Sequence, residues 1–360
     1  MRKMSKLRLG VCLTVVALLY FGAWYAEKSM GANNMLVTVL KKGAVYALIA
    51  VSMNLLNGFT GLFSLGQAGF MLVGAYVYAV FTIPLKKHAA VYQYYNGGII
   101  QFELPLIVAL LLAGIVAALL AALIGLPVLR LKSDYLAIAT LGFAEIIRAV
   151  VQWDSLGPIT NGSNLLKTYP TFNNTKIFGT TVLFPFIVSG VCIALILLII
   201  NSTYGRAFKA IRDDEVAAEA MGVNLFHHKE LSFVISCFFA GIGGALLAMF
   251  QGTVQANSFK SAMTYDVLLM VVIGGMGSVS GSVIASFLYI ACSEWWLRVL
   301  DNPLTIGSFN VPLLRSGFRM VVFSAVIMVV VLFFRRGIMG DKELWNIGMR
   351  RQKAGRRARK

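Results

Sequence analysis

Long apolar runs separated by short polar segments form the dominant pattern of the chain. Most runs hold about 20 residues, the number that an α-helix needs to cross the hydrocarbon core of a bilayer. The pattern therefore predicts an all-α, polytopic membrane protein with about ten transmembrane helices. The predicted spans are Leu9–Ala26, Gly43–Leu56, Leu65–Pro84, Leu104–Leu129, Tyr135–Trp153, Val182–Ile200, Leu231–Gln251, the short run Val267–Met276, Ser278–Leu297 and Gly317–Phe334. A turn predicted at 57–61 separates the second span from the third.

One polar segment with a helical pattern, Ser202–His228, interrupts these runs. Three acidic residues precede its helix-favouring sequence AAEAM, and Gly222 follows at the position of a C-cap. Roughly helical spacing predicts one small, apolar face, formed by Ala207, Ala210, Ile211, Ala217, Ala218 and Met221. Two interpretations remain open: a helix that docks in a groove of another protein, and an ordinary solvated connection.

The amino-acid composition shows that the chain is too apolar for a soluble domain. Of its 360 residues 58% are hydrophobic and 13% charged, and the mean hydropathy is +0.78. The net charge of +17 comes from basic residues that cluster at the ends of apolar runs, above all at the two termini. That distribution is typical of charge that sets topology and attracts the lipid bilayer, and it argues against nucleic acid as a partner.

An even number of spans places both termini on one side of the membrane, with Arg130, Lys132 and the 202–228 segment. The excess of basic residues on that side predicts that it is the cytoplasm. We expect a transmembrane domain over residues 1–345 and a basic, disordered cytoplasmic tail over 346–360. The first run is interpreted as a retained helix rather than a signal peptide, because no A-x-A cleavage site follows it.

The sequence shows no pattern of an enzyme or a metal site. Glycine clusters at 58–74, 241–244 and 274–281 lack the strand context and the lysine of nucleotide-binding loops. They indicate close helix packing, with a functional helix break at Gly274–Gly281 as the alternative for the last cluster. No nucleophile–base set is present, so we expect no catalytic residue, no metal and no cofactor. Buried thiols are predicted at four unpaired positions: Cys12, Cys192, Cys237 and Cys292.

Polar residues inside the predicted spans are the candidate pathway residues. Glu145 and Arg148 lie three residues apart on one helix face, and Glu294 and Arg298 form a similar pair. The first pair either lines or gates a pathway or anchors its helix near the interface, whereas we interpret the second as an anchor. A further polar seam either binds a solute or ties helices together, and its members are Asn54, Asn57, Ser64 and Gln67.

Seven blocks, in their order and spacing, resemble the membrane-spanning permease of branched-chain amino acid ABC importers, of the LivM type. The resemblance covers about Gly43–Trp345. The blocks are MNLLNGFTGLFSLGQAGFMLVGAY (53–76), LRLKSDYLAIATLGFAEIIR (129–148), TNGSNLL (160–166), YGRAFKAIRDDEVAAEAMGVN (204–224), FAGIGGALLA (239–248), VVIGGMGSVSGSVIA (271–285) and FRRGIMGDKELW (334–345).

The resemblance implies a subunit that works by alternating access in the cytoplasmic membrane of a bacterium. It implies a homologous second permease, two cytoplasmic ATP-binding subunits that bind the ATP, and an extracytoplasmic solute-binding protein. The 202–228 segment resembles the coupling loop that lies in a cleft of the ATP-binding subunit. Its contact and shape residues would be Gly205, Arg206, Arg212, Asp213, Glu215, Ala218 and Gly222.

Two positions depart from the family's pattern. Val216 stands where the coupling loop has a glutamate, and Gln67 stands where the SLGHA block has a histidine. Two alternative functions remain. A urea or short-amide importer permease has similar blocks, although the GIMGDKELW ending and the DYLAIATLGFAEIIR block favour amino acids. An ion-coupled secondary transporter would need an intramembrane carboxylate, for which Glu145 is the candidate.

Overall fold

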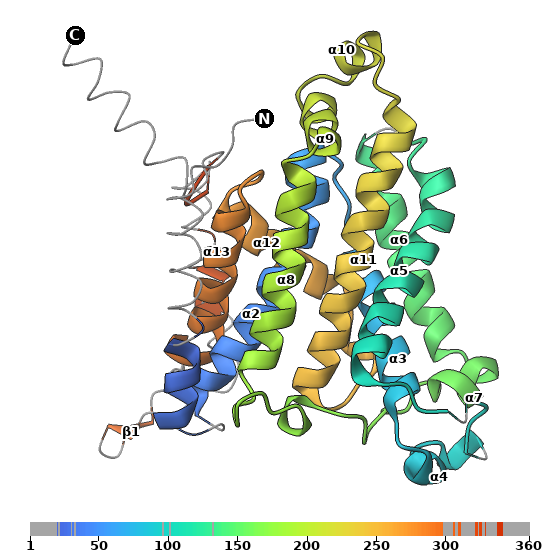
Figure 1. Cartoon of the computed structure of the whole chain (residues 1–360), viewed down its shortest axis with the longest axis vertical. Coiled ribbons are helices and arrows are strands. Elements are labelled where there is room, and N and C mark those ends of the chain that lie inside the picture. The colour runs from blue at the N-terminus through green and yellow to red at the C-terminus, as the bar shows by residue number, and fades with distance from the viewer. Residues whose placement is uncertain are drawn as a thin grey trace.

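The computed structural model describes residues 20, 22–29, 31, 34–95, 97–100, 102–131, 133–297, 305–306, 309–310, 321–322, 324–325, 328 and 337–340. Figure 1 shows these residues as a bundle of helices that run roughly along one axis. The predicted spans 9–26 and 317–334, Cys12, Arg298 and the tail 346–360 lie wholly or mostly outside the described residues.

Six long helices build the part of the bundle that the structure describes. Five of the described helices are long and apolar enough to cross a membrane, or six if the pair Gln67–Thr82 and Leu85–Val91, bent by 98°, forms one span. The all-α, polytopic fold is thereby confirmed, whereas the count of ten stays a prediction. The long helices are α2 (Met35–Asn54), α3 (Gln67–Thr82), α5 (Leu106–Val128), α6 (Ser133–Gln152), α8 (Leu183–Ile200) and α11 (Leu225–Gln251).

Shorter elements connect the long helices or pack beside them. The short α-helices are α4 (His88–Val91), α7 (Gly157–Thr160), α9 (Thr203–Asp213), α10 (Glu215–Ala220), α12 (Ser261–Gly274) and α13 (Val279–Ala291). Single turns are η2 (Leu85–Lys87), η3 (Gln93–Tyr95), η4 (Asp154–Leu156), η5 (Phe172–Asn174) and η6 (Ala256–Ser258), and two π-helical segments are η1 (Leu55–Thr60) and η7 (Cys292–Trp296). Strands β1 (Thr305–Ile306) and β2 (Phe309–Asn310) pair antiparallel.

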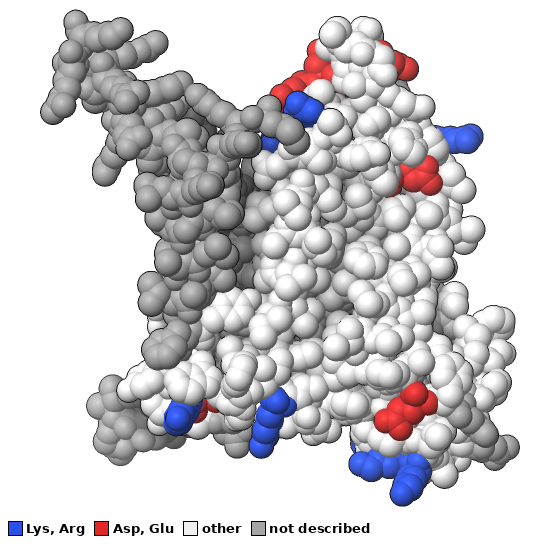
Figure 2. Space-filling view, viewed as in Figure 1, with Lys and Arg blue, Asp and Glu red and all other residues white. Residues whose placement is uncertain are grey.

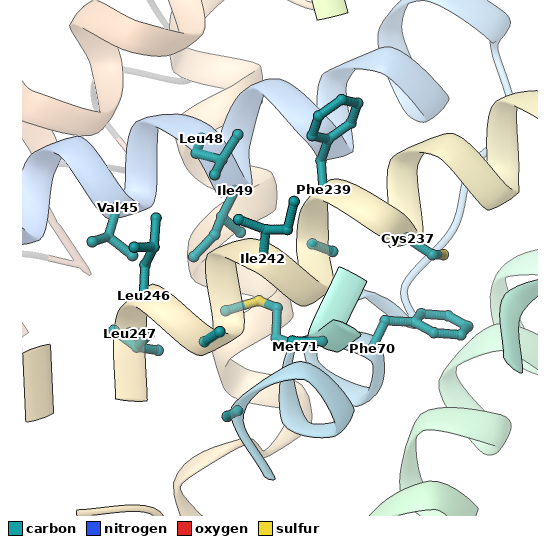
Figure 3. Packing of buried hydrophobic residues seen from close by; sticks show 14 of the residues in the cluster. Val45, Leu48, Ile49, Phe70, Met71, Cys237, Phe239, Ile242, Leu246 and Leu247 are labelled. Carbon is teal, nitrogen blue, oxygen red and sulfur yellow. The ribbon is translucent and has the colours of Figure 1, made fainter. Parts of the chain in front are cut away.

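Helix α11 lies at the centre, and its glycines set the distance to its neighbours. A Cβ atom on Gly241 would meet the carbonyl oxygen of Ala113 in α5 at 2.8 Å, and one on Gly244 would overlap the backbone of Met71 in α3. A Cβ on Gly243 would meet the side chain of Ile49 in α2 at 2.5 Å. The predicted close packing through small residues is therefore confirmed. Figure 3 shows the apolar side chains of α2, α3 and α11 that fill the space between these contacts.

Charged side chains gather at the two ends of the bundle. In Figure 2 the visible Lys, Arg, Asp and Glu residues lie near the ends, and an uncharged belt crosses the middle. The helices α5 and α8 have mean hydropathies of 3.1 and 3.0, and much of their surface is exposed. An apolar belt of this kind is the surface that a bilayer covers.

Three helix starts and one turn differ from the sequence predictions, one of them the start of α12 at Ser261 rather than Val267. Helix α2 begins at Met35 rather than Gly43, because the side chain of Asn34 accepts from the Leu36 amide at 3.0 Å and caps the helix. The turn predicted at 57–61 is wrong: residues 55–60 continue α2 as a π-helix, with apolar side chains buried, and Gly61 ends it at φ +78°. Helix α11 begins at Leu225 rather than Leu231, where Asn224 caps it.

The helices α12 and α13 form a hairpin. At 1.5 Å per residue α12 is roughly 21 Å long, so it does not cross a hydrocarbon core of about 30 Å alone, whereas α13 continues without a break into η7. The chain turns between them at Gly275 and Gly277, which have φ of +109° and +88°. The predicted break in the glycine cluster is confirmed by this turn.

Candidate functional site

The polar segment between α8 and α11 folds as two helices that meet at Asp214. The backbone of Asp214 is extended, which separates α9 from α10. Its carboxylate oxygen Oδ1 accepts from the amides of Val216 at 2.9 Å and Ala217 at 3.1 Å. The side chain therefore caps the first turn of α10, where backbone N–H groups have no helical partner.

Gly222 ends α10, as the sequence predicts. The amide of Gly222 donates to the carbonyl of Glu219 at 2.9 Å, and the amide of Val223 donates to the carbonyl of Ala218 at 3.1 Å. This pair of bonds is the Schellman motif, which needs a left-handed residue after the helix. Gly222 has φ +84°, a conformation that costs little for glycine alone.

The predicted single apolar face over α9 and α10 is wrong, because the break at Asp214 turns the two helices differently. Ala218 is buried, with 4% of its surface exposed, whereas Val216 and Met221 are 77% and 85% exposed. Figure 1 shows α10 outside the bundle at its upper end. The helix thus presents two apolar side chains among the carboxylates of Asp213, Glu215 and Glu219.

Two buried side chains fix α9 to the bundle. Phe208 is 0% and Ile211 1% exposed, and Gly205 packs so closely on the backbone of Ile200 that a Cβ atom would overlap it. Sequence analysis selected Ile211 and Gly205 but missed Phe208. The signal was available, because Phe208 lies three residues before Ile211 on the same helix face.

Arg212 connects α9 to the π-helical end of α2. Its Nη1 donates to the carbonyl of Gly58 at 3.2 Å, while Nε and Nη2 donate to Asp213 Oδ1 at 3.1 and 3.0 Å. Lys209 Nζ lies 5.4 Å from the ring centroid of Phe59. On α10, Glu215 pairs with Lys229 of α11 at 2.6 Å, whereas Arg206 is exposed.

The four polar seam residues are buried and bonded within the chain. The Asn57 side chain bonds the backbone of Ser64 at 3.3 and 3.4 Å, and Gln67 Nε2 donates to Ser52 Oγ at 2.9 Å. Asn54 bonds the turn between α12 and α13 instead. The seam is therefore not one surface: its members tie different segments together, which is the second of the two interpretations above.

Glu145 and Arg148 form the predicted pair, and the structure adds polar partners. Arg148 Nε donates to Glu145 Oε2 at 2.7 Å, and Ser261 of α12 donates to Glu145 Oε1 at 2.6 Å. Arg148 Nη1 and Gln152 Nε2 both donate to Asn257 Oδ1, at 3.4 and 3.0 Å. The side chains of Arg148 and Glu145 are 26% and 37% exposed, so this cluster is a polar patch on the surface of α6.

Glu294 has a partner on α2 that its spacing does not suggest. Its carboxylate pairs with Lys42 of α2 at 2.5 Å, while Arg298 lies outside the described residues. Asp266 of α12 accepts from the hydroxyl of Tyr289 at 2.7 Å. Neither Asp266 nor Lys42 was predicted from the sequence, because each meets its partner from another helix and the two positions of such a pair have no regular spacing along the chain.

Glu27 lies at the opposite end of the bundle from α10 and is buried. Its carboxylate accepts from the Thr181 amide at 2.9 Å, from the Thr181 hydroxyl at 2.6 Å and from the Val182 amide at 2.8 Å. Burial raises the pKa of Glu27, but these hydrogen bonds and the charge of Lys41 outweigh it, so the pKa lies below the ordinary value. The carboxylate joins the segment 22–29 to the start of α8.

Comparisons with known proteins agree over most of the chain. The family model for the branched-chain amino acid transport system permease component matches residues 35–333. The high-affinity branched-chain amino acid transport system permease protein LivM of Escherichia coli is 34% identical over 312 residues, which cover 78% of this chain and 68% of that protein. LivH of the same organism is 23% identical over 314 residues, covering 84% and 93%. No solved structure matches the chain.

Proposed function

The chain belongs to the family of branched-chain amino acid transport permeases, and from this premise we propose that it is a membrane-spanning subunit of an ATP-driven ABC importer for leucine, isoleucine and valine. The subunit forms half of the translocation pathway and itself carries out no covalent chemistry. Its partners are a homologous second permease, two cytoplasmic ATP-binding subunits that bind the ATP, and an extracytoplasmic solute-binding protein. The identity to LivM supports the substrate class.

The projecting helix α10 is the element that carries this proposal. It is capped at both ends, held by α9, and exposes Val216 and Met221 among carboxylates, which suits a helix that docks in a groove. In the proposed complex α10 lies in a cleft of an ATP-binding subunit. Ala218 and Gly222 set its shape, and charged residues of α9 and α10, namely Arg206, Asp213 and Glu215, contact that subunit. In this proposal both termini lie on the same, cytoplasmic side as α10. The subunit itself lies in the cytoplasmic membrane of a bacterium.

The polar patch on α6 is the candidate wall of the pathway. Exposed faces of α5 and α8 hold only apolar side chains, as a lipid-covered surface requires, whereas α6 exposes part of the Glu145–Arg148 pair. Charged side chains at membrane depth cost about 2.5–3.5 kcal/mol each on insertion scales and therefore face protein or water. We place this patch toward the water-filled pathway and the second permease.

Copurification of the solubilised complex tests the proposal. ATP-binding subunits should copurify with the wild-type permease and should be lost when Gly222→Arg and Ala218→Glu are combined, because these changes strain the C-cap and enlarge a buried position. Replacement of Lys176, an exposed residue in the connection between η5 and α8, by Glu serves as the control and should leave the complex intact. Uptake that persists without any ATPase would overturn the proposal and favour an ion-coupled transporter with Glu145 as its carboxylate.

A further inference from the structure

The turn between α12 and α13 is held by the side chain of Asn54 and by backbone contacts with residues 337–340. Residues 275–278 form this turn, and it lies toward the same end of the bundle as α9 (Figure 1). Met276 at its tip is 49% exposed, while Ser278 is fully buried and caps α13 by accepting from the Gly281 amide at 3.1 Å. The turn is therefore accessible at its tip and fixed at its base.

Asn54, at the end of α2, holds one side of the turn with every polar atom of its side chain. Nδ2 donates to the carbonyl of Ser278 at 2.9 Å and to the hydroxyl of Ser282 at 2.8 Å, and Oδ1 accepts from the Gly277 amide at 2.9 Å. The side chain is 0% exposed, so water does not replace these bonds. A buried carboxamide with all its partners fixes one geometry, because any displacement leaves unpaired polar groups.

Residues 337–340 hold the opposite side. The amides of Ile338 and Met339 donate to the carbonyls of Ile273 at 2.8 Å and Gly274 at 3.2 Å, the last residues of α12. A Cβ atom on Gly337 would meet Gly275 Cα at 2.6 Å, and one on Gly275 would meet the Gly340 carbonyl oxygen at 2.7 Å. Glycine at these positions allows the two backbones to touch.

Gly58 links this turn to α9. A Cβ atom on Gly58 would overlap both the Asn54 carboxamide and the Gly277 amide, so the three groups form one contact. The carbonyl of the same residue accepts from Arg212 Nη1 of α9. Gly61, at the end of the π-helix, packs against Arg212, whose Cγ would lie 3.0 Å from a Cβ on that glycine. Arg212 therefore contacts both ends of the segment 58–61.

We propose that Arg212, Gly58 and Asn54 form a mechanical relay that carries the movement of α9 to the α12–α13 hairpin, and that this hairpin is the element that the ATP-binding subunits move. The inference rests on the proposed function, because it takes α9 and α10 as the docking element. Arg212 and Asn54 act here as positioning residues: neither contacts ATP nor needs to contact the transported solute. A displacement of α9 is passed on through the hydrogen bond from Arg212 to the Gly58 carbonyl, and then through the buried, fully bonded Asn54 side chain, which lies too close to Gly58 to admit a Cβ atom there.

The test uses the complete importer in proteoliposomes, with Arg212→Gln in the permease. Three quantities are measured: ATPase activity stimulated by the loaded binding protein, leucine uptake per ATP hydrolysed, and the rate of thiol labelling at Met276→Cys with and without vanadate-trapped nucleotide. The parent protein without Met276→Cys gives the background from native cysteines. Arg130→Gln is the matched control, because Arg130 lies over the ring of Phe226 at 5.7 Å and not on the relay.

A relay predicts that Arg212→Gln retains the ATP-binding subunits and hydrolyses ATP, while uptake per ATP falls by about tenfold, within the usual range of coupling between sites. The nucleotide-dependent change in labelling at Met276→Cys should also be lost. If Arg212→Gln prevents assembly, Arg212→Lys, which keeps the charge and the packing on Gly61, takes its place with a smaller loss expected.

If Arg212→Gln shows the wild-type uptake per ATP and the wild-type nucleotide-dependent change in labelling, the relay is overturned while the importer function stays intact. A parallel fall of ATPase activity and uptake, with the labelling change retained, would also overturn the relay. That result would show that Arg212 acts in docking the ATP-binding subunit and not in passing on its movement. A different result would identify failure of the proposed function itself: a wild-type permease that retains no ATP-binding subunit and shows no nucleotide-dependent labelling.

Discussion

Gly74 of α3 and Gly241 of α11 face each other with no room for a side chain between them: a Cβ atom on Gly74 would overlap the carbonyl group of Gly241. This contact, repeated by Gly244 against Met71, brings two central helices to backbone distance. Small residues at such crossings are what allows helices to pack closely inside a membrane, where the hydrophobic effect offers little attraction between them.

Gly74→Ala should therefore destabilise the permease, since the backbone of α11 must move to admit the methyl group. Overpacking of this kind costs about 1–3 kcal/mol, which lowers the unfolding temperature measured in detergent. Gly142→Ala is the control, because a Cβ atom on Gly142 meets nothing within 4 Å in α6. Equal unfolding temperatures for the two variants would contradict the close contact.

Asp214→Ala should loosen α10, because the amides of Val216 and Ala217 lose their acceptor. Loss of an N-cap costs about 1 kcal/mol, so hydrogen exchange at these two amides should become about fivefold faster. Asp214→Asn keeps a side-chain oxygen and should retain most of the protection. If the alanine and asparagine variants exchange alike, the cap contributes nothing to the helix.

Glu145 and Arg148 should behave as a coupled pair in a double-mutant cycle. Either single change, Glu145→Gln or Arg148→Gln, leaves a charged partner on the surface of α6, while the double change removes both charges. We expect a coupling free energy of about 1 kcal/mol from denaturation in detergent, a modest value because the side chains are about a third exposed. Strict additivity would show that the pair is not linked in solution.

Stability should depend on pH through Glu27. Because its pKa is lower in the folded than in the unfolded chain, the stabilisation is complete above the unfolded value of 4.5 and is lost as the pH falls through the lowered pKa. Glu27→Gln should lower stability at neutral pH, because its NH₂ group cannot accept from Thr181 or Val182. It should also reduce the loss of stability at acidic pH, the acid limb of the stability profile. An unchanged acid limb in the variant would assign the pH dependence to other carboxylates.

Local patterns predicted much of the fold and part of the candidate site. The caps of α10 and the Glu145–Arg148 pair follow from neighbours within four residues, so spacing alone suggests them. Apolar run lengths likewise predict α5, α6 and α8 to within two residues of their ends. These features depend on helix geometry, which is the same wherever the helix lies.

Features that depend on tertiary contacts were missed. For Asn54 the sequence left solute binding and helix tying open, and its partners on the turn before α13 and on α13 lie more than 200 residues later in the chain. The π-helix at 55–60 looked like a turn, because its sequence LLNGFT holds turn residues. Only the burial of Leu55, Leu56 and Phe59 shows why it stays helical. Lys42 and Glu294 meet across 252 positions, a separation at which spacing carries no information.

The contact between residues 337–340 and the glycine turn also sets an order of events during biosynthesis. The turn leaves the ribosome about 60 residues before the segment that completes it, which at roughly 5–20 residues per second is a delay of about 3–12 s. During that time the turn between α12 and α13 has Asn54 as one support, while the other support is still untranslated. Completion of the hairpin is therefore among the last steps of maturation, and a ribosome that stops before codon 337 leaves a permease whose turn is bound on one side only.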